Sequence, residues 1–263
     1  MPSQPLPVFL PRIAPKGPVG FVQGALIQFR AAEFLLARPH LWLLVLVPVV
    51  LNALLLAGLF YWGFSYIADE LRDSLASHDA WYWHALSWFV RIFFWAVVLV
   101  IVYFIFTPLA LVIAAPFNDA LGLRAERLYG FAVADTRPAL AALVGDTVFC
   151  LLNECKRLVV VIGVFLLLLL LNLVPVVGNA AYVAASLAWG AWCAALEFTS
   201  YAADRRRIAF AAKWAMLSRH RAAAFGFGLA TVGLLLVPFV NVLAVAVSAV
   251  AGTMLFGAWT ETD

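Results

Sequence analysis

Two long apolar stretches dominate the first half of the chain. Leu41–Ile67 contains no charged residue, and Leu86–Ala115 contains one, Arg91. A helix rises about 1.5 Å per residue, so either stretch is long enough to cross the hydrocarbon core of a bilayer, which is about 30 Å thick. Because lipid offers the backbone no hydrogen-bond partners, such stretches cross as helices. The pattern predicts two long transmembrane helices.

The segments beside these stretches mix polar and apolar residues. Gly20–Ala37 is too polar to span and is typical of an amphipathic helix in the membrane interface. Arg205–Arg221 is also amphipathic, and its basic residues favour contact with anionic lipid. Ala68–His84 carries four carboxylates and an aromatic cluster, which predicts a loop on the non-cytoplasmic side. Pro116–Gly130 is polar and basic and is expected to follow the second helix.

A short string recurs in the second half of the chain. LVPVVGN at Leu173–Asn179 and LVPFVN at Leu236–Asn241 each separate two apolar arms. The repeat predicts two helical hairpins with proline and asparagine at the apex. Their arms are marginal in length for a full crossing, so short spans and hairpins that penetrate part of the bilayer both remain open.

Composition and charge place the chain in the membrane. Of its 263 residues, 66% are hydrophobic and 12% charged, and we expect a flexible proline-rich tail over residues 1–19 and a single helical membrane domain over residues 20–260. Every lysine and arginine except Arg72 and Arg91 lies before the first stretch, between the second stretch and the first hairpin, or between the hairpins. By the positive-inside rule these regions are cytoplasmic, which puts both termini inside.

The motifs of common enzyme and metal sites do not occur in the sequence. There is no nucleotide-binding loop, no HExxH and no GxSxG, and the four histidines are scattered. We therefore expect no enzyme activity, no cofactor, no bound metal and no nucleic-acid partner. The three cysteines lie in apolar or helical stretches and are interpreted as small buried thiols.

Polar residues at membrane depth are the candidates for function. They are asparagines beside prolines or at the predicted apices: Asn52, Asn118, Asn179 and Asn241. A helix broken at depth leaves backbone N–H groups that favour an anion. The same residues are also suited to capping helix ends or joining neighbouring helices, and for each one alone that role is favoured.

A collinear set of short motifs resembles a known family. AAPFND at Ala114–Asp119 with AER at Ala125–Arg127, PVVLN at Pro48–Asn52, VPVVG at Val174–Gly178 and VPFVN at Val237–Asn241 look like the signature of the CysZ-type sulfate permeases, in the etoposide-induced-protein domain family. The resemblance implies an all-helical, oligomeric protein of the bacterial inner membrane, with two long spans and partly penetrating hairpins. It also implies that sulfate enters for cysteine synthesis without an ATPase.

The chain departs from this family at the expected substrate site. The family uses a glycine followed by paired arginines at the cytoplasmic start of the first long helix, where this sequence has His40, then Trp42 and Leu43. Arg38 is the nearest cation. The family's Tyr-x-Asp-Tyr-Pro is altered here to Tyr201-Ala-Ala-Asp204-Arg205.

The leading hypothesis is a permease for sulfate or a related oxyanion, in an all-α membrane protein that associates with lipids and with copies of itself. The candidate substrate-binding residues are Arg38, His40, Asn52, Asn118, Asn179 and Asn241. Two alternatives stay open: a membrane scaffold of the same fold that moves no solute, and a transporter of a different, apolar or lipid-like solute.

Overall fold

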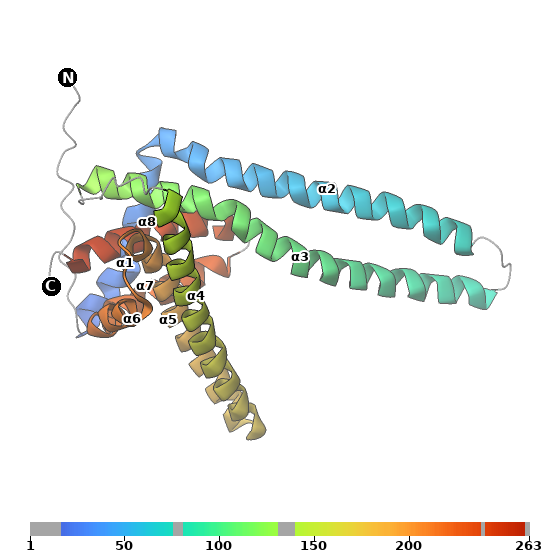
Figure 1. Cartoon of the computed structure of the whole chain (residues 1–263). Helices are drawn as coiled ribbons and strands as arrows, with labels where there is room; N and C mark the ends of the chain where they lie inside the picture. The colour runs from blue at the N-terminus through green and yellow to red at the C-terminus, as the bar shows by residue number, and fades with distance from the viewer. Residues whose placement is uncertain (1–16, 76–80, 131–139, 238–239, 261–263) are drawn as a thin grey trace. The chain divides into compact units, whose positions relative to one another are not determined.

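The computed structural model describes residues 17–75, 81–130, 140–237 and 240–260, and every regular element in these ranges is helical (Figure 1). This confirms the all-α class for the described part of the chain. In chain order, the elements are α1 (Gly17–Leu36), η1 (Pro39–Leu41), α2 (Trp42–Leu75), α3 (Trp81–Tyr129), α4 (Leu140–Leu169), η2 (Leu170–Leu173), α5 (Val177–Arg205), α6 (Phe210–Arg219), α7 (Arg221–Leu235) and α8 (Val240–Thr260).

Five helical segments in the described residues are long and apolar enough to cross a membrane. They are Gly17–Leu36, Pro39–Tyr61, Leu151–Leu173, Val177–Arg205 and Leu243–Thr260. The chain is therefore a multi-pass membrane protein. Most of the predicted tail, residues 1–16, and the stretch with Arg137 and Pro138 lie outside the described residues.

The long helices extend further than the apolar stretches that predicted them. Helix α2 runs to Leu75 and α3 starts at Trp81, so much of the predicted loop Ala68–His84 is helical, and only residues 76–80 lie outside the description. Helix α3 also continues through Pro116 to Tyr129. Hydropathy shows where the apolar side chains end. A helix, in contrast, ends where its backbone hydrogen bonds end, and charged side chains do not interrupt these hydrogen bonds.

The chain forms two compact units. The long-helix unit is Leu43–Phe117, with most of α2 and α3. The core unit contains the rest, with α1, the last part of α3 from Asn118, and α4 to α8. In the long-helix unit, Asn52 on α2 donates a hydrogen bond from Nδ2 to the carbonyl oxygen of Ala110 on α3, over 3.4 Å.

Glycines set the spacing of helices in the core unit. A Cβ on Gly228 of α7 would lie 1.8 Å from the carbonyl oxygen of Ala191 on α5, and one on Gly226 would lie 1.9 Å from that of Phe21 on α1. At both places only glycine lets the backbones approach so closely, as at small-residue contacts of membrane helices. Helix α1 is thus helical as expected, with one face buried against α7. The expectation that it is too polar to span is wrong, because Gly17–Leu36 is long and apolar enough to cross a membrane, and its location in the membrane interface stays a prediction.

Helices α4 and α5 form the first predicted hairpin, joined by η2 and a tight turn (Figure 1). The turn is closed by hydrogen bonds from Val177 N to Pro175 O (2.8 Å) and from Gly178 N to Val174 O (3.0 Å). A Cβ on Gly178 would lie 1.9 Å from the carbonyl oxygen of Leu171. The string LVPVVG therefore specifies this apex through a proline turn and a glycine that admits a carbonyl.

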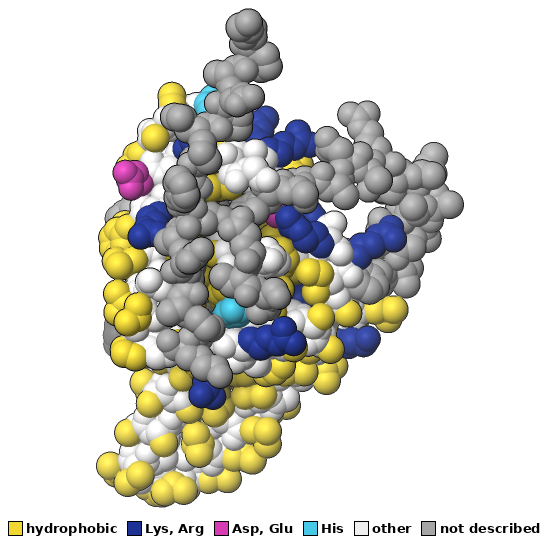
Figure 2. Space-filling model, turned by 90° about the vertical axis from the view of Figure 1, so that its left-hand side faces the viewer, with side chains coloured by type: hydrophobic (Ala, Val, Ile, Leu, Met, Phe, Trp, Pro, Cys, Tyr) yellow, Lys and Arg dark blue, Asp and Glu magenta, His cyan; other side chains and the backbone are white. Residues whose placement is uncertain are grey.

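The outer part of this hairpin is apolar on its surface. Leu173 is 77% exposed and Val176 81%. Figure 2 shows hydrophobic side chains over the lower part of the molecule, which the hairpin forms, and lysine and arginine gathered above it. Exposed apolar surface of this extent is typical of contact with lipid.

Helices α7 and α8 form the second hairpin. Helix α8 begins at Val240, directly before Asn241, whose backbone N–H donates to the carbonyl oxygen of Val237 over 3.1 Å. Pro238 and Phe239, in the centre of the second string, lie outside the described residues. How deeply either hairpin enters a bilayer stays a prediction.

Candidate functional site

Arg38 and His40 lie where the chain passes from α1 into α2. Arg38 precedes η1 and is half-buried, with its guanidinium carbon 4.0 Å from the centroid of the Phe34 ring and Nη1 3.4 Å from the Phe34 carbonyl oxygen. His40 is exposed on η1. Among the described residues, no carboxylate forms an ion pair with Arg38. The junction thus presents a cation whose charge is available to an anion.

Trp42 stands where the resemblance places the first of the paired arginines. Its indole Nε1 donates a hydrogen bond to the carbonyl oxygen of Leu35 over 3.1 Å. The same carbonyl, at the end of α1, also accepts a hydrogen bond from the backbone N–H of Arg38 over 3.1 Å. Trp42 therefore fixes the turn between the helices and supplies no charge there.

Tyr129, at the end of α3, completes this junction. Its ring stacks on Phe34 with centroids 5.1 Å apart. Burial raises the pKa of Tyr129 to about 12, although the positive charges of Arg38 and then Arg30 act to lower it. The phenol is therefore neutral near pH 7, beside two arginines. Sequence reasoning missed Arg30 and Tyr129, because nothing local indicates that α3 ends beside α1.

Asn118 lies elsewhere in the core unit. It is 7% exposed, and its side chain lies near the phenol of Tyr201 on α5. Asn179 is exposed near the start of the same helix, 22 residues from Tyr201, or about 33 Å along the helix axis. Asn241 is exposed at the start of α8. Within the core unit, Arg38 and His40 therefore lie at the same junction. Asn118 and Asn179 lie near opposite ends of α5.

Residues of the family-like motifs on α3, Asp119 and Glu126, contact the end of α5, where the altered tyrosine motif Tyr201–Arg205 lies. Glu126 is 1% exposed and accepts hydrogen bonds from Arg205 Nε to Oε2 (3.2 Å) and from Arg206 Nη1 to Oε1 (2.7 Å). Arg205 also pairs with the half-exposed carboxylate of Asp119, over 2.5 Å. Gly122 leaves room for this arginine, because a Cβ there would lie 3.2 Å from Arg205 Nη2.

We call Asp119, Glu126, Arg205 and Arg206 the arginine–carboxylate cluster. Its two carboxylates balance its two guanidinium groups, so it has no positive charge left over for an anion. A buried carboxylate held by two arginines is costly to disrupt. The cluster therefore joins the end of α3 to the end of α5, and it is not the site that the geometry favours for an oxyanion.

Helix α4 is joined to the same end of the core unit by its own polar residues. Arg157 forms ion pairs with Glu154 on α4 and with Glu197 on α5. The side-chain oxygen of Asn153 accepts a hydrogen bond from the backbone N–H of Phe210, at the start of α6, over 3.2 Å. Lys213 on α6 pairs with Asp204 on α5. These contacts fix α4, α5 and α6 together.

No group of three His, Cys, Asp or Glu side chains suited to a metal ion occurs in the described residues. In the described residues, the ionisable groups that lie near one another include the ion pairs above, and Arg38, Arg30 and Glu33 around Tyr129.

Comparison with known proteins identifies relatives over nearly the whole chain. Residues 28–246 match the family described as sulfate transporter CysZ/etoposide-induced protein 2.4. A sulfate transporter CysZ of Pseudomonas aeruginosa is 34% identical, over 87% of this chain and 91% of the relative. The CysZ of Pectobacterium atrosepticum is 27% identical, over 87% and 82%, and that of Vibrio cholerae 28%, over 81% and 84%.

These matches run through α1 to α8 and include the arginine–carboxylate cluster and both hairpins. The chain belongs to the sulfate transporter CysZ/etoposide-induced protein 2.4 family.

Proposed function

We propose that this member of the family is a sulfate permease, which admits sulfate or a related oxyanion across the bacterial inner membrane without ATP. The observation that carries the proposal is the match to relatives named sulfate transporters, over 87% of the chain and 91% of the Pseudomonas protein. The five apolar helical segments support it, because they suit a protein that works within a bilayer. On this proposal the protein is a transporter and not an enzyme.

The anion enters at the junction of α1 and α2. Arg38 has no carboxylate partner among the described residues, in contrast to Arg205 and Arg206. A guanidinium group binds an oxyanion through charge-assisted hydrogen bonds. His40 lies two residues away on the exposed turn, and Arg30 adds a second positive charge near Tyr129, where Glu33 contributes a negative one. On this proposal, Arg38 and Arg30 take the role of the family's arginine pair at different positions in the sequence.

Beyond this entrance, the candidates for contact with the anion in the core unit are Asn118, Asn179 and Asn241, and Asn52 is a separate candidate in the long-helix unit. Their amide groups donate hydrogen bonds to an oxyanion without a permanent charge. We further propose that α2 and α3 each cross the membrane, that the two hairpins penetrate it at least in part, and that both termini are cytoplasmic. Copies of the chain assemble with one another within the lipid.

Sulfate flux into liposomes that carry the purified protein tests the proposal. We expect flux above that of protein-free liposomes and a loss of about 10- to 100-fold in Arg38→Gln, because a charge-assisted hydrogen bond contributes about 1.5–3 kcal/mol. Arg124→Gln is the matched control, since Arg124 is an exposed arginine of the core unit with no ion pair in the described part. Absence of flux above the blank would reject the permease and favour the scaffold.

A second pair of variants tests the path. Asn179→Leu with Asn241→Leu is expected to reduce flux, while Asn172→Leu, at a third exposed asparagine close to the first apex, leaves it unchanged. Unchanged flux in the stably folded double variant would remove the apices from the path. Selenate and phosphate, added as competitors in the wild-type assay, then define the oxyanion class.

A further inference from the structure

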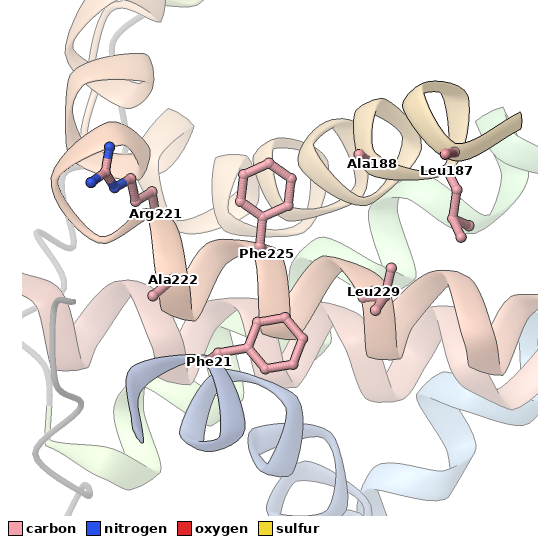
Figure 3. Close-up of a pocket in the computed structure, with 8 residues that line it drawn as sticks. Phe21, Leu187, Ala188, Arg221, Ala222, Phe225 and Leu229 are labelled. Carbon is pink, nitrogen blue, oxygen red and sulfur yellow. The ribbon is translucent and has the colours of Figure 1, made fainter. Parts of the chain in front are cut away.

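A groove lies on the surface of the core unit between α1, α5 and α7. It encloses about 490 Å³, which is within the range of about 300–1,000 Å³ typical of small-molecule sites. Its lining is apolar apart from one residue, and the side chains that define it are Phe21, Leu187, Ala188, Phe225, Leu229 and Arg221. Figure 3 shows Arg221 at one end and Leu187 with Leu229 at the other.

The walls of the groove are held in place by packing. Phe225 packs against Trp192 of α5, with ring centroids 5.2 Å apart. The floor follows from the close approach of α7 to α1, where Gly226 meets the carbonyl oxygen of Phe21. A groove with a fixed wall and floor needs little ordering to accept a ligand.

Within the described residues, the charge at the end of the groove has no partner. Arg221 is exposed, and no ion pair or hydrogen bond to its side chain occurs in the part of the chain that the structure describes. It starts α7, directly after the basic helix α6. A ligand that fits therefore has a negative group at one end and an apolar chain behind it.

We propose that this groove binds one phospholipid with an anionic headgroup, whose acyl chain lies along the apolar lining and whose phosphate is held by Arg221. The groove borders α5, a helix apolar enough to cross the membrane, and Leu187 and Leu229 are 46% and 40% exposed. A bilayer supplies a ligand of this chemistry at high local concentration, and anionic lipids concentrate at the cytoplasmic leaflet. This site is separate from the proposed entrance at Arg38 and does not depend on sulfate transport.

Native mass spectrometry of the full chain, titrated with dioleoyl phosphatidylglycerol, tests the proposal. Arg221→Gln removes the charge, and Ala188→Phe fills the groove from an exposed position. Their matched controls are Arg124→Gln and Ala181→Phe, which are exposed positions outside the lining. We expect the affinity for the first bound lipid to fall about tenfold in both groove variants and to stay unchanged in both controls.

Dioleoyl phosphatidylcholine has the same acyl chains but no net charge, so it separates the contribution of the headgroup charge from that of the acyl chain. We expect the wild type to bind it more weakly than phosphatidylglycerol. Groove variants that bind phosphatidylglycerol as their controls do would overturn the proposal. It would equally be overturned if Ala188→Phe lowered the oligomeric mass without changing lipid binding, since the groove would then be a contact between copies. Displacement of the lipid by millimolar inorganic phosphate alone would also overturn it.

Discussion

The guanidinium group of Arg205 holds the buried carboxylate of Glu126, with Nε 3.2 Å from Oε2 and Nη2 3.0 Å from Oε1. Two motifs that are 79 residues apart in the sequence thus share one salt bridge. Because Arg206 binds the same carboxylate, Glu126 is the centre of the contact between α3 and α5.

Replacement of Glu126 by glutamine is expected to destabilise the protein by about 3 kcal/mol, because it leaves two arginines facing a neutral group at a buried position. Thermal unfolding in detergent measures the effect. Asp119→Asn is the control, since this carboxylate is half-exposed and its pair with Arg205 contributes at most about 1 kcal/mol. Equal losses in the two variants would show that Glu126 is not the centre of the cluster.

Gly228→Ala is expected to destabilise the core unit by about 1–3 kcal/mol, because the added Cβ meets the backbone of α5 and forces the helices apart. Gly233→Ala on the same helix is the control: a Cβ there meets nothing within 4 Å, so the better helix propensity of alanine leaves stability unchanged or raises it. Unfolding temperatures in detergent distinguish the two. A tolerated alanine at Gly228 would contradict the close crossing.

Gln28 is the polar centre of the packing between α1, α7 and α8. Its Nε2 donates to Thr231 Oγ1 (2.6 Å) and to Ser248 Oγ (3.1 Å), and all three side chains are buried. Gln28→Leu is expected to cost about 1–3 kcal/mol, because it leaves the buried hydroxyl of Ser248 without a partner, while Thr231 keeps only the hydrogen bond that it donates to the Phe227 carbonyl oxygen.

The double variant Gln28→Leu with Ser248→Ala tests this cause. It removes the hydroxyl group that Gln28→Leu leaves without a partner, so it is expected to lose less stability than the sum of the two single variants. Additive losses, measured as unfolding temperatures in detergent, would mean that the amide contributes through packing volume alone.

Because of Tyr129, the free energy of unfolding is expected to depend on pH in the alkaline range. Its pKa of about 12 in the folded protein exceeds the ordinary value of 10.0, so the folded state keeps a proton that the unfolded state loses. The resulting stability is complete below pH 10 and is lost as the pH rises towards 12. Unfolding temperatures of wild type and Tyr129→Phe between pH 9 and 12 measure it; parallel curves would exclude the phenol as the cause.

The sequence alone predicted the apolar stretches and the helical class, and its first proline string marked the turn between α4 and α5. These features follow from local physics: an uncharged run longer than a bilayer core, and a proline turn with a small residue at the apex, act within a few residues. The family-like motifs were also visible in the sequence. Their partners were not, because the contact of Glu126 with Arg205 depends on how α3 and α5 pack.

The ends of helices were predicted less well than their apolar parts. The polar segment after Ala115 was read as lying beyond a helix, yet α3 continues to Tyr129. That extension carries Asn118 and Glu126 to α5 and Tyr129 to α1. Residue type indicates whether a segment prefers water, but it does not indicate where a helix stops once packing supports it.

The sequence by itself determined that this is a helical membrane protein of a known family, with Arg38 as the cation nearest to the expected site. Only the tertiary structure decided which cations are neutralised. Arg205 and Arg206 are paired with carboxylates from a distant segment, whereas Arg38 and Arg221 have no carboxylate partner in the described residues. The reason is physical: the net charge of a site is a sum over neighbours in space, and the packing of glycine-bearing helices decides which residues become neighbours.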